Sequence, residues 1–110
     1  MKVTTSAMLA TLSLAQTLRQ EGERRGFYFG AAINEKRLPE ANHPIYWDTF
    51  KQHFNMGVAE NHCKPSQIQK TQGIFDFTDC TALLNRTKAD NQKFRGHVLV
   101  WHRQNASWFD

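Results

Sequence analysis

Polar and aromatic side chains follow two apolar segments of this chain, at the points where each segment ends. The set is Glu60, Asn61 and Lys64 after residues 54–59, and His97, Trp101, His102 and Gln104 within and after residues 93–100. These side chains provide hydrogen-bond donors and acceptors beside a flat indole ring. A sugar needs both features, because its hydroxyls take paired donors and acceptors while its C–H face stacks on an aromatic ring. The residues therefore indicate half of a carbohydrate site.

A catalytic pair for glycoside hydrolysis is not evident in the same residues. Such hydrolysis needs two carboxyl groups, roughly 5 to 5.5 Å apart for retention and about 6.5 to 9.5 Å apart for inversion. Of the acids, Glu60 lies at a predicted strand end, whereas Asp76 and Asp79 lie around a predicted helix start, where the helix dipole explains them. Each candidate also has a simpler interpretation: Glu60 as a loop acid, His97 as a structural histidine and Trp101 as a packing residue.

The elements that must position these side chains alternate along the sequence. Residues 93–100 contain the apolar run 98–100, which is typical of a strand buried on both faces of a parallel sheet. Because side chains alternate along a strand, Arg95, His97, Leu99 and Trp101 should share one face. Residues 27–33 and 54–59 are predicted as the two preceding strands, and α/β folds place their sites at the carboxyl ends of such strands.

Three helices are predicted between and before these strands. The first covers residues 12–25 and stops at Gly26, and the second begins near Pro44, since proline suits the first helical turn. A polar loop, residues 34–42, precedes it. Aromatic residues at helical spacing in and after the second helix are predicted to be core: Tyr46, Trp47, Phe50 and Phe54. The third helix should follow a loop through Gly73 and end near Asn91.

The third helix is predicted from its cap and its apolar stripe. Thr78 is a suitable N-cap, and the buried stripe should contain Cys80, Leu83, Leu84 and Thr87. The resulting order of helix, strand, helix, strand, helix, strand favours right-handed βαβ units. The fold class is therefore α/β with a parallel sheet. Three strands cover neither edge of such a sheet, so self-association through the exposed sheet edge is expected.

Composition limits the other classes of partner. The 110 residues are at most one domain, and 40% hydrophobic content is enough for a core. The net charge of +4 is dispersed, with no basic stripe and no segment of membrane-spanning length, so neither nucleic acid nor a membrane is expected as partner. Cys63 and Cys80 form no C-x-x-C pair, and the sequence leaves a disulfide between them open. No metal and no cofactor are expected.

Several motifs together resemble glycoside hydrolase family 10, the endo-1,4-β-xylanases. They are Gly26-Phe27-Tyr28-Phe29-Gly30-Ala31-Ala32, Phe54-Asn55, Ala59-Glu60-Asn61-x-x-Lys64, Gly73-x-Phe75-x-Phe77-Thr78-Asp79 and Arg95-Gly96-His97-Val98-Leu99-Val100-Trp101-His102-x-Gln104. The resemblance extends from about residue 17 to the last residue. It implies a partial (β/α)8 barrel, about the first three βα units with an N-terminal helix over residues 16–110.

The resemblance also implies roles for individual residues. Glu60, Asn61 and Lys64 would hydrogen-bond sugar hydroxyls upstream of the scissile bond of xylan or a xylo-oligosaccharide. His97 and Trp101 would shape the subsite where the sugar ring distorts, with Gln104 close by. In this family of retaining enzymes the acid/base glutamate follows strand four and the nucleophile follows strand seven, so the 110 residues alone should be inactive. The alternatives are a non-catalytic xylan-binding remnant and a functionless truncated gene product.

Residues 1–15 fit either a signal peptide or the start of a helix, and the resemblance favours a secreted or extracellular protein. In that case Asn85-Arg86-Thr87 and Asn105-Ala106-Ser107 are glycosylation sequons, the second on the predicted cleft. Asn105-Ala106 stands where the family usually has leucine-proline. The loop after the third strand should therefore be less constrained.

Overall fold

The structure, a computed structural model, describes residues 16–109. Residues 1–15, interpreted above as a signal peptide or a helix start, lie outside the described residues. The helices and strands, in chain order, are α1 (Leu18–Arg24), β1 (Gly30–Ile33), α2 (Pro44–His53), β2 (Met56–Ala59), α3 (Pro65–Ile68), α4 (Thr78–Ala89) and β3 (Lys93–Arg95). Three short 3-10 turns complete the list: η1 (Glu35–Arg37), η2 (Glu40–Asn42) and η3 (Ser107–Phe109). The predicted alternation of strands and helices is confirmed.

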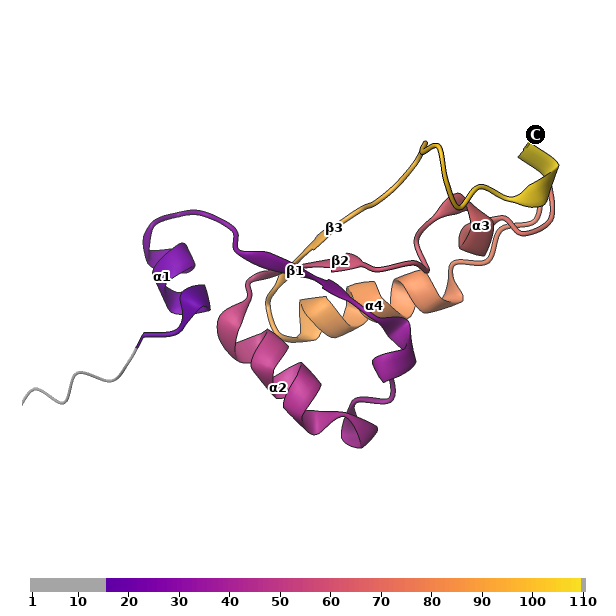
Figure 1. Cartoon of the computed structure of the whole chain (residues 1–110). Helices are drawn as coiled ribbons and strands as arrows, with labels where there is room; N and C mark the ends of the chain where they lie inside the picture. Colours follow the sequence, from indigo (N-terminus) through magenta and orange to yellow (C-terminus); the bar gives the residue numbers. More distant parts are fainter. Residues whose placement is uncertain (1–15, 110) are drawn as a thin grey trace, which may run out of the picture.

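The three strands form one parallel sheet in the order β1-β2-β3. Gly30 pairs with Met56, and Met56 pairs with Lys93, so the strands start level with one another. Helices α2 and α4 lie on the same side of the sheet (Figure 1). On the other side Ala32 and Arg95 are exposed. One face is therefore packed under helices, and the opposite face is open.

The core lies between the sheet and α2 and α4. Its central members, each buried, are Ile33, Trp47, Phe50, Ala59, Cys63 and Leu83. Trp47 is fully buried, and its indole N–H donates to the Arg37 carbonyl at 2.7 Å, which satisfies the one polar group of the ring. Of the aromatic residues predicted as core, Trp47 and Phe50 are buried, while Tyr46 and Phe54 are half-buried against them.

Gly57, in β2, lies directly against this core. A Cβ atom there would lie 3.0 Å from Phe50 Cζ, 3.0 Å from Thr87 Cγ2 and 3.2 Å from Ile33 Cδ1. Gly57→Ala should therefore overpack the core and lower the free energy of unfolding by about 1–3 kcal/mol, as measured by urea denaturation. Gly96→Ala is the matched control, because nothing lies within 4 Å of its Cβ position. Equal stability of the two variants would contradict the packing described here.

The predicted third strand is too long. β3 ends at Arg95, and in the apolar run after it Leu99 is 95% exposed and Val100 77% exposed, while Val98 is half-buried. The reason is pairing: β2 ends at Ala59, so residues beyond position 96 have no strand beside them to continue the ladder. The first strand was also predicted too long. It was expected from residue 27, but β1 starts at Gly30, and Phe27 and Tyr28 are exposed.

Helix starts and stops follow the sequence more closely. α2 begins at Pro44 as predicted, and Gly26 follows α1 with a φ of 71°, the left-handed conformation that suits glycine. Asn91 after α4 has a φ of 54°. α3 was predicted as loop, although Pro65 at its first position was a signal for it. Within the described residues, no helix is long and apolar enough to cross a membrane.

The start of α4 differs from the prediction in one residue. Thr78 is the first helical residue, not the N-cap, which is Phe77. Asp76 Oδ1 instead accepts a hydrogen bond from the Thr78 backbone N–H at 3.0 Å. Hydrogen bonds from the Thr78 backbone and side chain lower the pKa of Asp76. On the predicted buried stripe, Leu83 and Thr87 are buried and Cys80 and Leu84 are half-buried.

A disulfide joins the two cysteines. Cys63 after β2 and Cys80 in the first turn of α4 are bonded, with their Cα atoms 5.0 Å apart. The bond closes a loop with a sequence separation of 17 residues. A loop of about this size stabilises a fold by roughly 3 kcal/mol in the chain-entropy description. The pairing that the sequence left open is thus present, and it ties the segment after β2 to α4.

Candidate functional site

The carboxyl ends of β1 and β2 place two polar side chains against each other. Ile33 and Ala59 are register partners, so Asn34 and Glu60 leave the sheet side by side. Asn34 Nδ2 donates to Glu60 Oε2 at 2.6 Å, and the Glu60 backbone N–H donates to the Ile33 carbonyl at 2.8 Å. Asn34 was not among the predicted site residues. Its place directly after the first predicted strand was the signal that could have identified it.

A second group of side chains surrounds the ammonium of Lys64. Lys64 Nζ lies 2.5 Å from Gln104 Oε1 and 3.4 Å from Asn61 Oδ1, and Gln104 Nε2 donates to the same Asn61 oxygen at 3.0 Å. The Lys64 ammonium also lies 5.0 Å from the centroid of the Trp101 ring. Lys64 is 8% exposed, so its charge is held mainly by amide oxygens and an aromatic face.

The backbone brings Gln104 to this group across a long stretch of sequence. The Ser66 N–H at the start of α3 donates to the Gln104 carbonyl at 3.0 Å. Figure 1 shows the segment after β3 running back to end beside α3. The indole N–H of Trp108 donates to the Gln69 carbonyl at 2.7 Å, and this bond also holds the segment after β3 against the end of α3. Gln104 is thus placed by α3, an element that the sequence prediction omitted.

Trp101 lies beside the Lys64 group and near two histidines. Its ring centroid lies 6.5 Å from that of His97 and 5.1 Å from that of His102, which is exposed. Asn105 Nδ2 donates to the Trp101 carbonyl at 3.0 Å, so the loop expected to be loose is tied at its centre. Asn105 is a second residue that site prediction missed, and the same nitrogen would carry the glycan of its sequon.

Glu60 and His97 line one hollow on the open side of the sheet. The hollow measures about 350 Å³, and its other walls are Ala32, Val58, Ala59 and Arg95. Arg95 is exposed and forms no ion pair with any described residue. The structure therefore brings Asn61, Lys64, Trp101 and Gln104 into contact, and it places Glu60 and His97 beside them. We call these six residues the rim.

The rim contains both kinds of hydrogen-bonding group. Glu60 accepts, Lys64 donates, and the carboxamides of Asn61 and Gln104 do both. Trp101, half-buried, adds an apolar ring at the same edge. This combination suits a polyhydroxylated ligand. The described residues contain no cluster of three or more histidine, cysteine or acidic side chains that could hold a metal ion.

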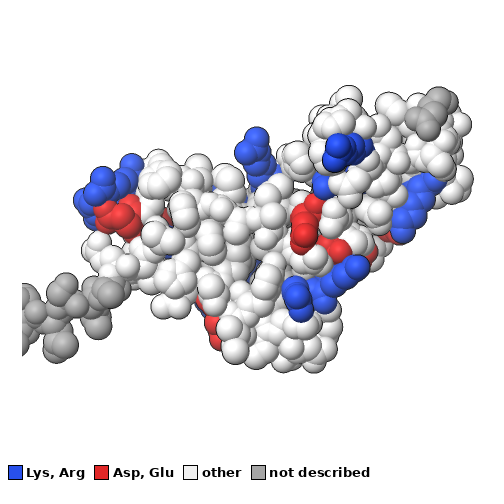
Figure 2. Space-filling model, viewed as in Figure 1, with Lys and Arg blue, Asp and Glu red and all other residues white. Residues whose placement is uncertain are grey.

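Charge is distributed in small groups elsewhere on the molecule. On the face seen in Figure 2, basic and acidic side chains lie next to each other in small groups, and these groups are apart from one another on the described residues. One such cluster is on α1, where Glu21 pairs with Arg24 and Arg25. Hydrogen bonds from Arg24 and Arg25 lower the pKa of Glu21 to about 2.

The comparisons with known proteins agree on one family. The model of Glycosyl hydrolase family 10 matches residues 17–110. Endo-1,4-beta-xylanase B of Neocallimastix patriciarum is 42% identical over 80 residues, which cover 73% of this chain and 9% of that protein. Endo-1,4-beta-xylanase A of Thermoanaerobacterium saccharolyticum is 43% identical over 83 residues, 76% of this chain and 7% of that protein. The chain thus spans less than a tenth of these relatives.

Solved structures give the same picture for the fold. Xylanase 10B from Thermotoga petrophila RKU-1, in complex with xylobiose, superposes with a TM-score of 0.81 at 25% identity, over 86% of this chain and 29% of that one. A mutant of the intracellular xylanase from Thermoanaerobacterium saccharolyticum, in complex with xylotriose, superposes with a TM-score of 0.72 at 36% identity, over 86% of this chain and 28% of that one. These matches confirm the predicted fold class, a partial (β/α)8 barrel of about three βα units.

Proposed function

Because this chain belongs to glycosyl hydrolase family 10, we propose that it provides the glycone-side substrate rim of an endo-1,4-β-xylanase. The observation that carries the proposal is the hydrogen-bonded group of Asn61, Lys64 and Gln104 against Trp101. It lies at the carboxyl ends of parallel strands, where barrels of this kind place their sites. The xylobiose and xylotriose complexes of the structural relatives support a β-1,4-linked xylose chain as the ligand class.

We assign the rim residues to two tasks. Glu60, Asn61 and Lys64 bind sugar hydroxyls upstream of the bond to be cleaved. His97 and Trp101 shape the subsite where the ring distorts, and Gln104 holds Lys64 and Asn61 in place. The ammonium and carboxylate make charge-assisted hydrogen bonds to hydroxyls, which are stronger than neutral ones.

Hydrolysis itself requires more than the rim. Retention needs two carboxyl groups about 5 to 5.5 Å apart, and in this family they follow strands four and seven. The three strands described here precede both. We therefore propose that the 110-residue chain binds xylo-oligosaccharide but does not cleave it, and that cleavage requires the remaining strands of a barrel.

The decisive experiment measures binding and hydrolysis on the same sample. Titration calorimetry with xylotriose and reducing-sugar release from soluble xylan are compared for the 110-residue chain alone and mixed with a second chain that supplies strands four to eight of a family 10 barrel. Binding without release, followed by release in the mixture, is the expected result. Binding that is never followed by release would favour the non-catalytic xylan-binding alternative. If the chain does not bind and neither sample releases sugar, the functionless alternative is favoured.

The free edge of β3 leads to a prediction about assembly. Among residues 16–109, β3 pairs with β2 on one side and has no strand on the other. Leu99, just beyond it, is 95% exposed. We expect the chain to self-associate with rising concentration, as measured by light scattering, because an uncovered strand edge beside apolar side chains favours pairing. Leu99→Lys should reduce the association. Ile45→Lys, at an 82% exposed residue on α2, should leave it unchanged.

The disulfide supports the proposed extracellular location. Disulfides persist in oxidising compartments and are rare in reducing ones. Cys63 and Cys80 are the only cysteines of the chain, and they are bonded to each other. We therefore propose that residues 1–15 act as a signal peptide for secretion, and that the barrel part of the chain begins at residue 16.

A further inference from the structure

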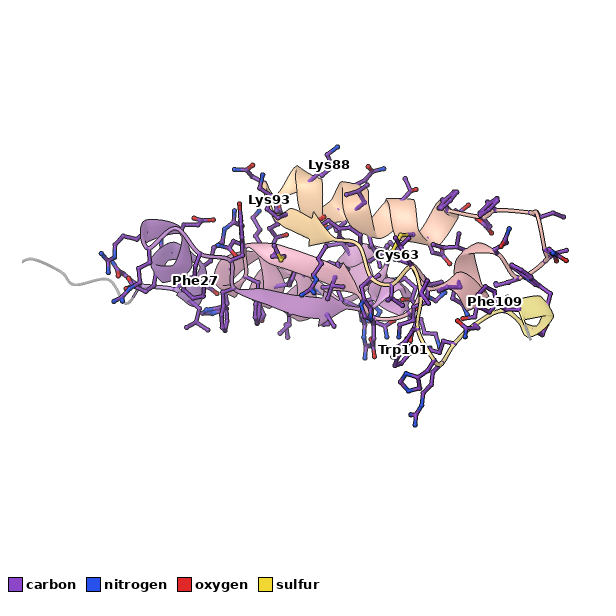
Figure 3. All side chains as sticks on the ribbon, turned by 90° about the horizontal axis from the view of Figure 1, so that it is seen from above. Phe27, Cys63, Lys88, Lys93, Trp101 and Phe109 are labelled. Carbon is purple, nitrogen blue, oxygen red and sulfur yellow. A yellow bond between two sulfur atoms is a disulfide. The ribbon has the colours of Figure 1, made fainter. Side chains whose placement is uncertain are left out.

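The segment that carries three of the rim residues has a second side, which the proposed sugar site does not use. We call residues 60–64 the rim loop. Glu60, Asn61 and Lys64 contact the rim partners already described. His62 and Cys63 lie between Asn61 and Lys64 in the sequence. His62 contacts η1 and the first turn of α4, and Cys63 contacts the first turn of α4. Figure 3 shows Cys63 and its disulfide on the α4 side of the loop, with Trp101 on the opposite side.

His62 lies between two carboxylates from different elements. Its Nδ1 is 2.5 Å from Glu35 Oε1 in η1, and its Nε2 is 3.3 Å from Asp79 Oδ2 in α4. The Glu35 side chain is only 6% exposed, and neither of its oxygens has a hydrogen bond with ideal geometry to a described residue. The His62 ring is therefore held close to this buried carboxylate without meeting hydrogen-bond geometry, and a protonated ring would offset the charge of the carboxylate.

The disulfide acts at the adjacent position. His62 and Cys63 are consecutive, and so are their partners Asp79 and Cys80. On the β1 side, Asn34 and Glu35 are consecutive and contact Glu60 and His62. The rim loop is thus fixed at neighbouring residues to both the segment after β1 and the start of α4.

We infer that His62 and the Cys63–Cys80 disulfide are positioning residues for the rim, together forming a clamp behind the rim loop. Lys64 directly follows Cys63 and is the N-cap of α3, and its N–H donates to the Asn61 carbonyl at 2.9 Å. The Gln104 backbone is bonded to Ser66, further along the same segment, so a displacement of Cys63 changes how Asn61 and Lys64, on either side of it, lie against the Gln104 side chain. The clamp keeps the ammonium and the two carboxamides within hydrogen-bonding distance before a sugar arrives.

This inference rests on the proposed function for its sugar readout, but it also has a readout that needs no sugar. The side-chain amide signals of Asn61 and Gln104 in NMR spectra report their mutual hydrogen bond directly. Dithiothreitol releases one half of the clamp: it reduces the disulfide to two thiols and is itself oxidised to its cyclic disulfide. The double variant Cys63→Ala/Cys80→Ala removes the same bond permanently and should no longer respond to the reagent.

His62→Leu removes the other half of the clamp, and His62→Gln is the conservative comparison because its amide keeps a polar donor beside Glu35. We expect dithiothreitol and His62→Leu each to weaken xylotriose binding by about five- to tenfold, the loss of one or two well-placed hydrogen bonds. Each should also shift both amide signals. His62→Gln should restore part of the affinity. Circular dichroism establishes which variants are folded, and for any variant that unfolds, the comparison of wild type with and without dithiothreitol decides.

The outcomes separate the clamp from the sugar site. If the oxidised chain does not bind xylotriose but the amide signals shift on reduction, the proposed function fails and the clamp stands. If the oxidised chain binds and neither affinity nor amide signals change on release of both halves, the clamp is overturned and the proposed function stands. Unchanged signals together with absent binding would overturn both.

Discussion

Trp47→Ala should lower the free energy of unfolding of this chain by about 3–5 kcal/mol, the range for removing a large aromatic side chain from a core. Trp47 is fully buried between Tyr46 and Phe50, and both rings pack edge-on against it. The guanidinium of Arg86 also lies 5.0 Å from its ring. The substitution leaves a cavity under the sheet and removes the indole donor to the Arg37 carbonyl.

Because small domains have total stabilities of only about 5–15 kcal/mol, a loss of this size removes a large fraction of the stability and should clearly lower the urea midpoint. Urea denaturation followed by circular dichroism measures it. Ile45→Ala is the matched control: it lies on the same helix but is 82% exposed, so its effect should stay within about 0.5 kcal/mol. A Trp47→Ala variant as stable as the Ile45→Ala variant would mean that the core is not where the structure places it.

Glu60→Gln should weaken xylotriose binding by about 10- to 100-fold, because hydrogen bonds to charged groups contribute roughly 1.5–3 kcal/mol. Glu60 is exposed at the hollow that it shares with His97, so its carboxylate is accessible to a ligand. The amide that replaces it has nearly the same shape but is a weaker acceptor. It also presents an NH2 group toward sugar donors or toward Asn34.

Titration calorimetry measures this change, with Asp48→Asn as the control for removing one negative charge. Asp48 is exposed on α2, which lies on the helical side of the sheet (Figure 1). Its substitution should leave both affinity and stability unaltered. Glu60→Gln should likewise leave the urea midpoint unchanged, since its side chain is exposed. Undiminished binding by Glu60→Gln would remove Glu60 from the proposed rim.

Local sequence patterns determined the elements and their order. Pro44 at a helix start, Gly26 and Asn91 after helix ends, and the alternation of short strands with helices are effects of backbone preference within a few residues. The aromatic spacing in residues 46–54 predicted the packed side of α2 in the same way. The motifs of residues 59–64 and 95–104 carried the family resemblance, which the comparisons confirm.

Tertiary structure alone decided the features that depend on distant neighbours. The run at residues 98–100 has strand composition, but a strand persists only while another strand lies beside it, and β2 ends at Ala59. The pairing of Cys63 with Cys80 and the contact of Asn34 with Glu60 depend on how the strand ends meet. The burial of Lys64 among amide oxygens depends on the return of Gln104 to α3. Such contacts join residues up to 40 positions apart. Propensities that act over one or two helical turns therefore cannot encode them.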